Sequence, residues 1–404
     1  MFESNTDTSR LPTPPAEALT HSATLVDQLR ADIAQSGPLT FGAYVHEALY
    51  RPGLGYYASG TQKFGAQGDF ITAPELGSVF AHCVARGIAR VLRQLSSKSV
   101  VLELGAGSGE FALHCLTALQ HLEALPQRYQ ILEVSPTLQT RQKERLESLP
   151  SELSSRVEWL DAPPSAPFEG VVFANEVIDA LPMERFGINE HGDVVQARVE
   201  LGEKPEALTL TAHAPTRAVA EGVLALQSRL RDRDEVWMPF YTHEFRPGLT
   251  GWLHTVTDHL TRGAALFVDY GTDELALYRG DRSRGTLLCH FQHRAHDDAL
   301  LWPGLQDITS WVDFSALANA AHDLGLTIDG YTTQAHMLID TGLDSVVSAR
   351  FEQATRTEQS ALAREVRQLT LPGDMGERFK ALSMRRGLDN GVFSPHHTSL
   401  THRL

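Results

Sequence analysis

The stretch "VVLELGAGSGEF", residues 100–111, decides the fold, because an apolar segment is followed by three glycines and then by a helical pattern. Such a strand, turn and helix brings the backbone close to a ligand. Each missing Cβ removes a clash, and the first turn of the helix offers free N–H groups. The stretch therefore predicts a nucleotide-type site at the end of a buried strand.

The spacing Gly105-x-Gly107-x-Gly109 narrows the choice of ligand. The dinucleotide fingerprint G-x-G-x-x-G would place its third glycine where this chain has Glu110, and no Lys-Ser or Lys-Thr pair follows the loop as in a P-loop. Glu103, just before the glycines, suits a ligand with a cationic centre and an amino-acid moiety, as in S-adenosylmethionine sites. Taken alone, the loop leaves a dinucleotide site and a simple structural turn open.

The rest of this region alternates short β-branched runs with helical patterns. This alternation is typical of parallel βαβ units whose sheet is covered by helices on both faces, so the predicted fold class is α/β. The expected strands are 99–105, 129–135, 156–161, 170–177, 264–271 and 378–386, and the expected helices in the first half are 111–124 and 138–149.

Acidic and amide side chains lie at the carboxyl ends of three further expected strands. Glu133 is placed to accept hydrogen bonds from ribose hydroxyls, and Asp161 could take an adenine amino group. Asn175 and Glu176 fall where the next strand leaves the sheet, at the edge where open α/β sheets bind ligands. Each acid alone could be a solvated strand end, and Asn175 could instead cap the next helix.

Composition limits the class of protein. The net charge of −15 argues against a broad nucleic-acid surface, and no apolar run approaches the ~18 residues of a membrane helix. Three isolated cysteines, Cys83, Cys115 and Cys289, make a disulfide framework improbable. We therefore expect a soluble protein in a reducing cytoplasm, without nucleic acid or a membrane span.

A histidine-rich segment, "CHFQHRAHDD", contains possible metal ligands at Cys289, His290, His293, His296, Asp297 and Asp298. No second group with standard ligand spacing lies nearby. We expect no metal here, and interpret the segment as lining a substrate entrance or bonding within itself.

Several long motifs together resemble the MidA-like family, which has bacterial and mitochondrial members. These motifs are "GDFITAPELG", "VLELGAGSGEFA", "YQILEVSP", "FANEVIDALPMERF", "LFVDYG", "RSRGTLLCHFQHRAHDD", "PGLQDITSWVDFSALA" and "LTLPGDMGERFKAL". The resemblance covers about residues 37–386. It implies a class I methyltransferase fold, Rossmann-like, with a mostly parallel seven-stranded sheet, helices on both faces, an N-terminal extension and inserted segments. It also implies S-adenosylmethionine as cofactor.

The resemblance and the strand ends together give the expected domains. They are a flexible N-terminus (1–23), a helical extension with a cofactor-covering loop (24–98), the first half of the core (99–186), an insertion or cap (187–262), the second half (263–390) with a substrate-loop insertion (272–315), and a C-terminal tail (391–404). The expected cofactor-binding residues are Asp69, Thr72, Pro74, Glu75, Glu103, Gly105, Gly107, Gly109, Glu133, Val134, Asp161 and Asn175.

For the mitochondrial member, the resemblance implies methylation of an arginine in a respiratory complex I subunit, so we expect an arginine-bearing protein as substrate. A carboxylate could orient the guanidinium by a bidentate pair. Glu176 is the first candidate for this role, with Asn175 and Asp179 as further catalytic candidates and Glu244 as a weaker one. The alternatives are a non-catalytic adenosylmethionine-binding assembly factor and a nicotinamide oxidoreductase, the latter disfavoured by Glu110.

Overall fold

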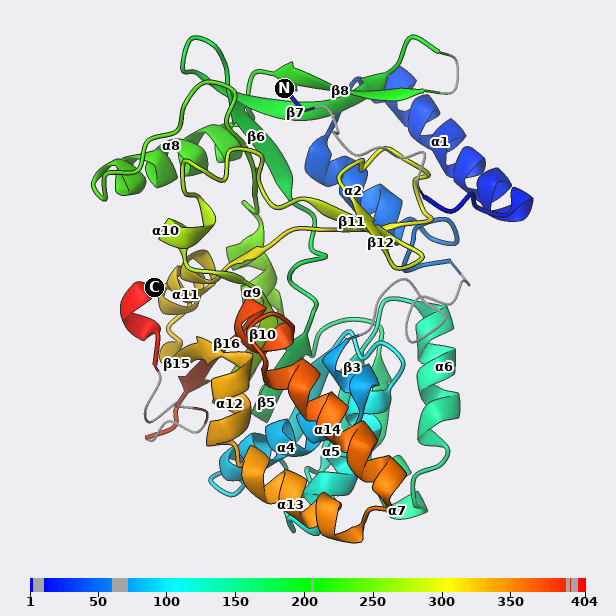
Figure 1. Cartoon of the computed structure of the whole chain (residues 1–404), viewed down its shortest axis with the longest axis vertical. Helices are drawn as coiled ribbons and strands as arrows, with labels where there is room; N and C mark the ends of the chain where they lie inside the picture. The colour runs from blue at the N-terminus through cyan, green and yellow to red at the C-terminus, as the bar shows by residue number, and fades with distance from the viewer. Residues whose placement is uncertain (3–10, 60–71, 205–206, 390–392, 394–398) are drawn as a thin grey trace. The chain divides into compact units, whose positions relative to one another are not determined.

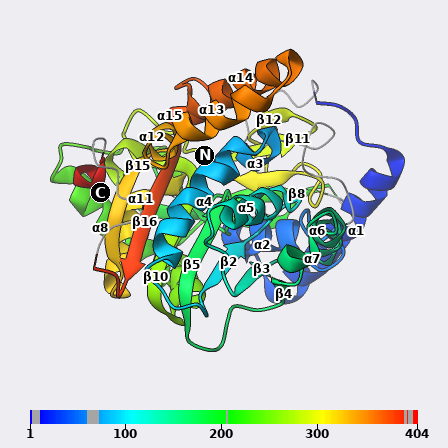
Figure 2. The same cartoon turned by 90° about the horizontal axis from the view of Figure 1, so that it is seen from below.

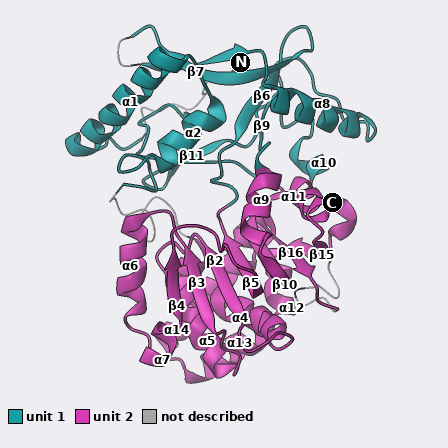
Figure 3. Ribbon diagram, turned by 180° about the vertical axis from the view of Figure 1, so that it is seen from behind, with its two compact units in different colours: residues 1–70, 178–248, 274–311 teal, residues 71–177, 249–273, 312–404 magenta. Residues whose placement is uncertain are grey.

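The computed structural model describes residues 1–2, 11–59, 72–204, 207–389, 393 and 399–404. The chain forms two compact units, coloured separately in Figure 3. Unit 1 consists of Met1–Phe70, Ile178–Gly248 and Glu274–Trp311, and unit 2 consists of Ile71–Val177, Leu249–Asp273 and Val312–Leu404.

Unit 2 is built on one mixed sheet, with its strands in the order β15-β16-β10-β5-β2-β3-β4 and β14 paired to β10. The pairs from β10 to β4 are parallel, whereas β16 runs antiparallel to both of its neighbours. The strands are β2 (Val100–Leu104), β3 (Arg128–Leu132), β4 (Val157–Leu160), β5 (Phe168–Asn175), β10 (Leu260–Thr272), β14 (Val312–Asp313), β15 (Thr327–Thr333) and β16 (Phe379–Arg386).

Helices cover both faces of this sheet, because successive strand residues point to opposite sides. Leu266 and Val268 belong to the core cluster that includes α4 and α5, while Phe267 between them contacts Trp252 of α9. Figure 2 shows α4 and α5 along one face of the sheet. The helices are α3 (Ala73–Leu76), α4 (Val79–Leu92), α5 (Glu110–His121), α6 (Pro136–Leu146), α7 (Ser151–Ser154), α9 (Leu249–Thr257), α11 (Phe314–Asp323), α12 (Gln334–Asp340), α13 (Leu343–Gln353), α14 (Arg356–Thr370), α15 (Met375–Arg378) and the 3₁₀ turn η2 (Thr401–Arg403).

The strand order reverses at β2. From β2 the chain continues to β3 and β4 on one side, and then returns to β5 and β10 on the other. Open α/β sheets bind ligands at the carboxyl ends of the strands flanking such a reversal. The site is therefore expected where β2 and β5 end, at the loop that starts with Gly105 and at Asn175.

Unit 1 contains a five-stranded sheet, β1-β7-β6-β9 with β8 paired to β7, and a three-stranded sheet, β12-β11-β13. Its helices include α1 and α2, which pack against the first sheet's β7, and α8, which packs in a separate core around Trp237 and Tyr241 (Figure 1). The elements are α1 (Ala16–Ser36), β1 (Leu39–Thr40), α2 (Phe41–Tyr50), β6 (Glu184–Ile188), β7 (Val194–Leu201), β8 (Leu208–His213), α8 (Arg217–Arg231), β9 (Thr242–Phe245), α10 (Glu274–Leu277), β11 (Leu288–Phe291), β12 (Arg294–His296) and β13 (Asp307–Thr309).

Several expectations need correction. The sheet of unit 2 is mixed, β14 is an eighth strand, and β15 is absent from the sequence-based assignment. Helix α1 begins at Ala16, inside the segment expected to be a flexible lead-in. The expected substrate loop, 272–315, contains α10 and the strands β11, β12, β13 and β14 rather than irregular chain.

The N-terminal extension and the two insertions are also not separate additions. Residues 1–70, 178–248 and 274–311 assemble into unit 1, because all three supply apolar side chains to one core and the last two also share a second core. The remainder of the expected extension, including α3 and α4, belongs to unit 2.

Within the described part of the chain, none of the helices combines the length and hydropathy needed to cross a bilayer. Cys83, Cys115 and Cys289 are buried free thiols.

Candidate functional site

The loop between β2 and α5 has a backbone that favours glycine. Gly105, Gly107 and Gly109 have φ angles of 61°, 55° and 87°, in the left-handed region that residues with a Cβ rarely adopt. The N–H of Gly105 donates to the Leu132 carbonyl at 3.0 Å, which ties the loop to the end of β3. Gly105 itself is exposed. Gly105 thus presents bare backbone at the carboxyl end of β2, with Gly107 half-buried and Gly109 buried behind it.

Glu103, the acid before this loop, lies in the core. It is 3% exposed, and its Oε2 accepts a hydrogen bond from the Tyr129 hydroxyl at 2.7 Å. Burial raises the pKa of Glu103 to about 8, against the opposing effect of the Tyr129 hydrogen bond. Glu103 and Val101 are two residues apart on β2, so their side chains point to the same face of the sheet, the face that α5 covers.

Glu133, at the end of β3, belongs to a buried network organised by Gln142 of α6. The Gln142 amide donates to Glu133 Oε2 and to the Gly107 carbonyl, each at 3.0 Å, and its oxygen accepts from Trp159 Nε1 at 3.0 Å. The other Glu133 oxygen accepts the Ser135 N–H at 2.9 Å. One amide therefore couples the expected ribose acid to the glycine loop.

A second glutamine of α6 connects the ends of β3 and β4. Gln139 Nε2 donates to the Glu133 carbonyl at 2.9 Å and to Asp161 Oδ1 at 3.3 Å. Val134, directly after Glu133, is 67% exposed. Asp161 is also exposed. An apolar face beside two acids suits an adenosine, with Val134 against the base.

The segment before α4 also meets the glycine loop. Ser108 Oγ donates to Glu75 Oε1, in α3, and burial raises the pKa of Glu75. Thr72 precedes α3 as its N-cap and Pro74 lies in its first turn. Asp69, the remaining residue expected here, lies outside the described residues.

The Glu110 carboxylate is bound by two side chains of the same chain, His114 and Arg145. Hydrogen bonds from His114, and then from Arg145, which approaches at 2.6 Å and 2.9 Å, lower its pKa to about 2. The residue at the position of the third dinucleotide glycine is therefore paired with Arg145 of α6.

Asn175 and Glu176 lie at the carboxyl end of β5, beside the loop. Glu176 has a φ of 54°, which costs about 1 kcal/mol or more for a residue that carries a Cβ. Its N–H donates to the Val268 carbonyl at 2.9 Å, and Asn175 Nδ2 donates to Glu176 Oε1 at 3.0 Å. Asn175 Oδ1 is buried and makes no hydrogen bond with the described residues. Asp179, the third catalytic candidate, belongs to unit 1, whereas Asn175 and Glu176 belong to unit 2.

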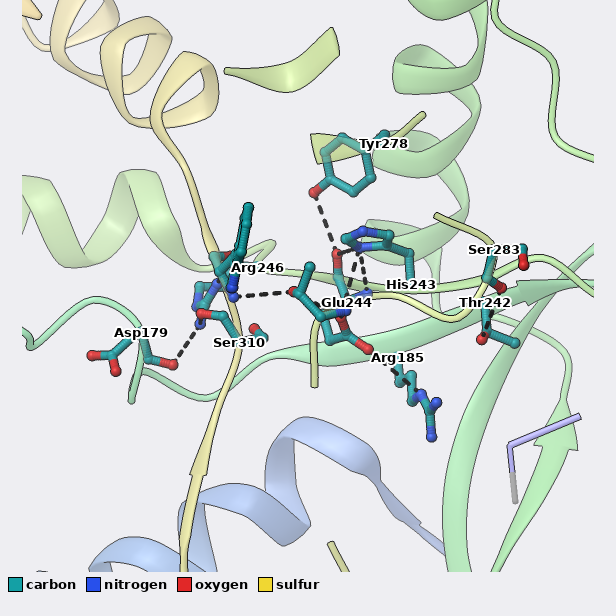
Figure 4. A network of polar contacts seen from close by, with 11 residues as sticks. Asp179, Arg185, Thr242, His243, Glu244, Arg246, Tyr278, Ser283 and Ser310 are labelled. Carbon is teal, nitrogen blue, oxygen red and sulfur yellow. Dashed lines mark hydrogen bonds and ion pairs between the residues drawn. The ribbon is translucent and has the colours of Figure 1, made fainter. Parts of the chain in front are cut away.

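Glu244, the weaker candidate, has structural partners within unit 1 (Figure 4). Its Oε2 accepts the Thr286 N–H at 2.6 Å and the Thr286 hydroxyl at 3.2 Å, and Arg185 Nε lies 3.6 Å from Oε1. The side chain is 2% exposed. Glu244 thus stabilises the connection between β9 and the segment before β11.

The histidine-rich segment forms a hairpin. Cys289 pairs with His296 and Phe291 with Arg294 across β11 and β12, and the two turn residues, Gln292 and His293, both have positive φ. In the residues that the structure describes, no three His, Cys, Asp or Glu side chains are arranged to hold a metal ion.

The residues present fit S-adenosylmethionine. The left-handed glycines admit close approach of the backbone, Glu133 is held with its oxygens at the end of β3, and Val134 offers an apolar surface. Sequence reasoning missed Gln139 and Gln142. Their spacing of three on a helix that begins with Ser135-Pro136, directly after Glu133, is the signal that could have identified them.

The Gln142 network predicts a loss of cofactor affinity in Gln142→Ala. Without the amide, the buried Glu133 carboxylate loses a donor, at a cost of about 1–3 kcal/mol. We expect S-adenosylhomocysteine to bind about tenfold or more weakly in isothermal titration calorimetry. Gln359→Ala is the matched control, since that amide bonds two carbonyls beside α14. Unchanged affinity with a lowered melting temperature would show that Gln142 only supports the fold.

The burial of Glu103 predicts a pH-dependent stability. Between its ordinary pKa of 4.5 and the value of about 8 in the fold, the folded chain holds a proton that the unfolded chain releases. The free energy of unfolding therefore falls as pH rises across this window. Glu103→Gln lacks this effect, so its melting temperature should gain a few degrees on the wild type between pH 5 and pH 8.

Glu110→Gln is the control for this measurement. The Glu110 pKa is lowered to about 2, so its contribution to stability is complete above about pH 4.5 and should not change between pH 5 and pH 8. Equal pH slopes for Glu103→Gln and the wild type would contradict the raised pKa.

Three comparisons place the chain. Residues 83–332 match a family model described as "Putative S-adenosyl-L-methionine-dependent methyltransferase". A structure from Burkholderia thailandensis, bound to S-adenosyl-homocysteine, is 37% identical with a TM-score of 0.90, and the alignment covers 98% of this chain and 100% of that one.

Curated relatives extend the match to eukaryotes. The protein arginine methyltransferase NDUFAF7 of Danio rerio is 28% identical over 89% of this chain and 86% of its own length, and that of Homo sapiens is 28% identical over 89% and 83%. Together with the glycine loop and the Glu133 network, these matches show that the chain belongs to this family of S-adenosylmethionine-dependent methyltransferases.

Proposed function

We propose that this methyltransferase acts on an arginine side chain of a partner protein, with Glu176 holding the guanidinium. The observation that carries the proposal is the left-handed conformation of Glu176 at the carboxyl end of β5, the neighbour of the strand β2 at which the strand order reverses. Strained residues that carry a side chain concentrate at functional sites. The conformation is retained although glycine or asparagine would adopt it at lower cost.

The chemistry asks little of the protein beyond positioning. When bound, S-adenosylmethionine supplies an electrophilic methyl group on a sulfonium sulfur. An arginine is protonated at all physiological pH values, and a carboxylate that receives two of its N–H groups would localise the positive charge on those nitrogens. Glu176 would in this way leave the third nitrogen as the nucleophile, aligned for in-line attack. Such alignment supplies roughly 7–11 kcal/mol of the barrier reduction.

Asn175 would fix the orientation of that carboxylate. Its amide donates to Glu176 Oε1 at 3.0 Å, which would fix the plane of the carboxylate. As the attacking nitrogen forms its bond to the methyl carbon, the bond from that carbon to the sulfonium sulfur would break and S-adenosylhomocysteine would leave. The attacking nitrogen would lose one proton to solvent, and the methylated guanidinium would remain a cation paired with the Glu176 carboxylate until it dissociates.

The relatives support the choice of substrate. The proteins of Danio rerio, Drosophila melanogaster and Homo sapiens are each named protein arginine methyltransferase, at 28% identity over about nine-tenths of this chain. The arginine-bearing protein that this chain would methylate is part of the proposal.

A non-catalytic adenosylmethionine-binding assembly factor is the alternative, since the same glycine loop would serve it. Incubation of the protein with methyl-labelled S-adenosylmethionine and a lysate separates the two. Label in protein arginine supports the enzyme. Cofactor binding without label in any acceptor would favour the assembly factor.

Glu176→Gln tests the assigned role. The neutral amide pairs poorly with a guanidinium, so we expect methyl transfer to fall about 100-fold or more while S-adenosylhomocysteine affinity changes little. Glu144→Gln, an exposed acid on α6, controls for the change in net charge. Full transfer by Glu176→Gln would overturn the assignment.

A further inference from the structure

Arg246, directly after β9 in unit 1, binds a ring of main-chain carbonyls (Figure 4). Its guanidinium donates to the carbonyls of Asp179 at 2.6 Å, Trp311 and Ser310 at 3.0 Å, and Leu181 at 3.4 Å. Within the described residues, all of its hydrogen bonds go to these main-chain oxygens. A planar guanidinium with five N–H groups in a fixed fork can satisfy four acceptors, whereas a lysine ammonium has three donors at one point.

The bound carbonyls lie on segments that lead from one unit to the other. The chain passes between units after residues 177, 248 and 311, among other places. Asp179 and Leu181 follow the first of these points, Ser310 and Trp311 precede the last, and Arg246 itself lies two residues before the second. The Ser310 N–H also donates to the Asp179 carbonyl at 3.3 Å. One side chain thus joins three connecting segments on their unit 1 side.

The first of these segments is continuous with the candidate catalytic residue. Glu176 is two residues before Ile178, where unit 1 resumes, and in its left-handed conformation its N–H donates to the Val268 carbonyl at 2.9 Å. A strained residue persists only when its surroundings fix it. On one side of Glu176 the chain is fixed by the pairing of β5. On the other side, residues 179–181 are fixed by the hydrogen bonds from Arg246 to main-chain carbonyls, which we call the Arg246 clasp.

We propose that Arg246 is a positioning residue for methyl transfer, which holds the segment after Glu176 so that its carboxylate keeps one orientation. The inference rests on the proposed function, because Glu176 is the group that it orients. Arg246 touches neither substrate nor cofactor in this account, and it acts through the main chain.

The test is the conservative variant Arg246→Lys in the full chain. We expect kcat for labelled methyl transfer to fall about tenfold or more, while S-adenosylhomocysteine affinity stays within about twofold. The amide of Glu176 should exchange with deuterium about tenfold faster than in the wild type. Unchanged kcat and unchanged exchange at Glu176 would overturn the proposal.

Arg386→Lys is the matched control. The Arg386 guanidinium also binds main-chain carbonyls, those of Thr257 at 2.9 Å, Leu260 at 3.0 Å and Leu324 at 2.7 Å, but all lie within unit 2. It should lose melting temperature to a similar degree and keep kcat within about twofold. An equal loss of kcat in both lysine variants would reduce Arg246 to a general stabilising role and overturn the proposal.

Two combinations of results distinguish a failure of this inference from a failure of the proposed function. If Glu176→Gln is inactive and Arg246→Lys is fully active with unchanged exchange, the proposed function stands and the clasp fails. If the wild type labels no acceptor, the proposed function fails while the exchange measurement still decides the clasp.

Should Arg246→Lys fail to fold, exchange in the wild type decides. The amides of Glu176 and Ser310 should then open together, with rates within about threefold. Independent opening that differs by about 100-fold would overturn the proposal.

Discussion

Parallel pairing of β2 with β3 on one side and β5 on the other brings their carboxyl ends to one edge of the unit 2 sheet. The glycine loop, Glu133 and Asn175 all depend on this arrangement, because each lies at the end of its strand or directly after it. The loop can only follow its path with φ angles near +60°, and Gln142 then links it to Glu133. The cofactor site is thus a property of one sheet edge and one helix.

The sequence was sufficient for the parts of the site that are local. The glycines, Glu133 and Glu176 follow directly from strand ends, and the structure places each of them at the carboxyl edge of the sheet. Gln142 was missed because its partners, Gly107 and Trp159, are 35 and 17 residues away, and no local pattern marks an amide that faces a carboxylate. Short edge strands such as β14 carry too few residues for a periodicity to be recognised.

Unit 1 shows why the domain boundaries were harder to predict from the sequence than the site. Its cores combine α1, β7 and Ile308 in one cluster and Phe186, Val223 and Tyr278 in another, so residues hundreds of positions apart bury one another. Hydrophobic patterns reveal that a face is apolar but not which partner covers it. The burial of Glu103 is a similar case. Its side chain faces the core like that of Val101, two residues earlier on the strand, but a glutamate is not recognised in a sequence as a core residue.

Glu176 carries an implication for how the chain trades stability against activity. A sequence selected for stability alone would place glycine or asparagine at a position with φ of 54°, since these relieve the clash of Cβ with the backbone. Such replacements belong to the class of stabilising substitutions that are found readily and that cost function. A screen of this protein for thermal tolerance would therefore be drawn towards position 176, and its most stable products would be those with the least capacity to hold a guanidinium.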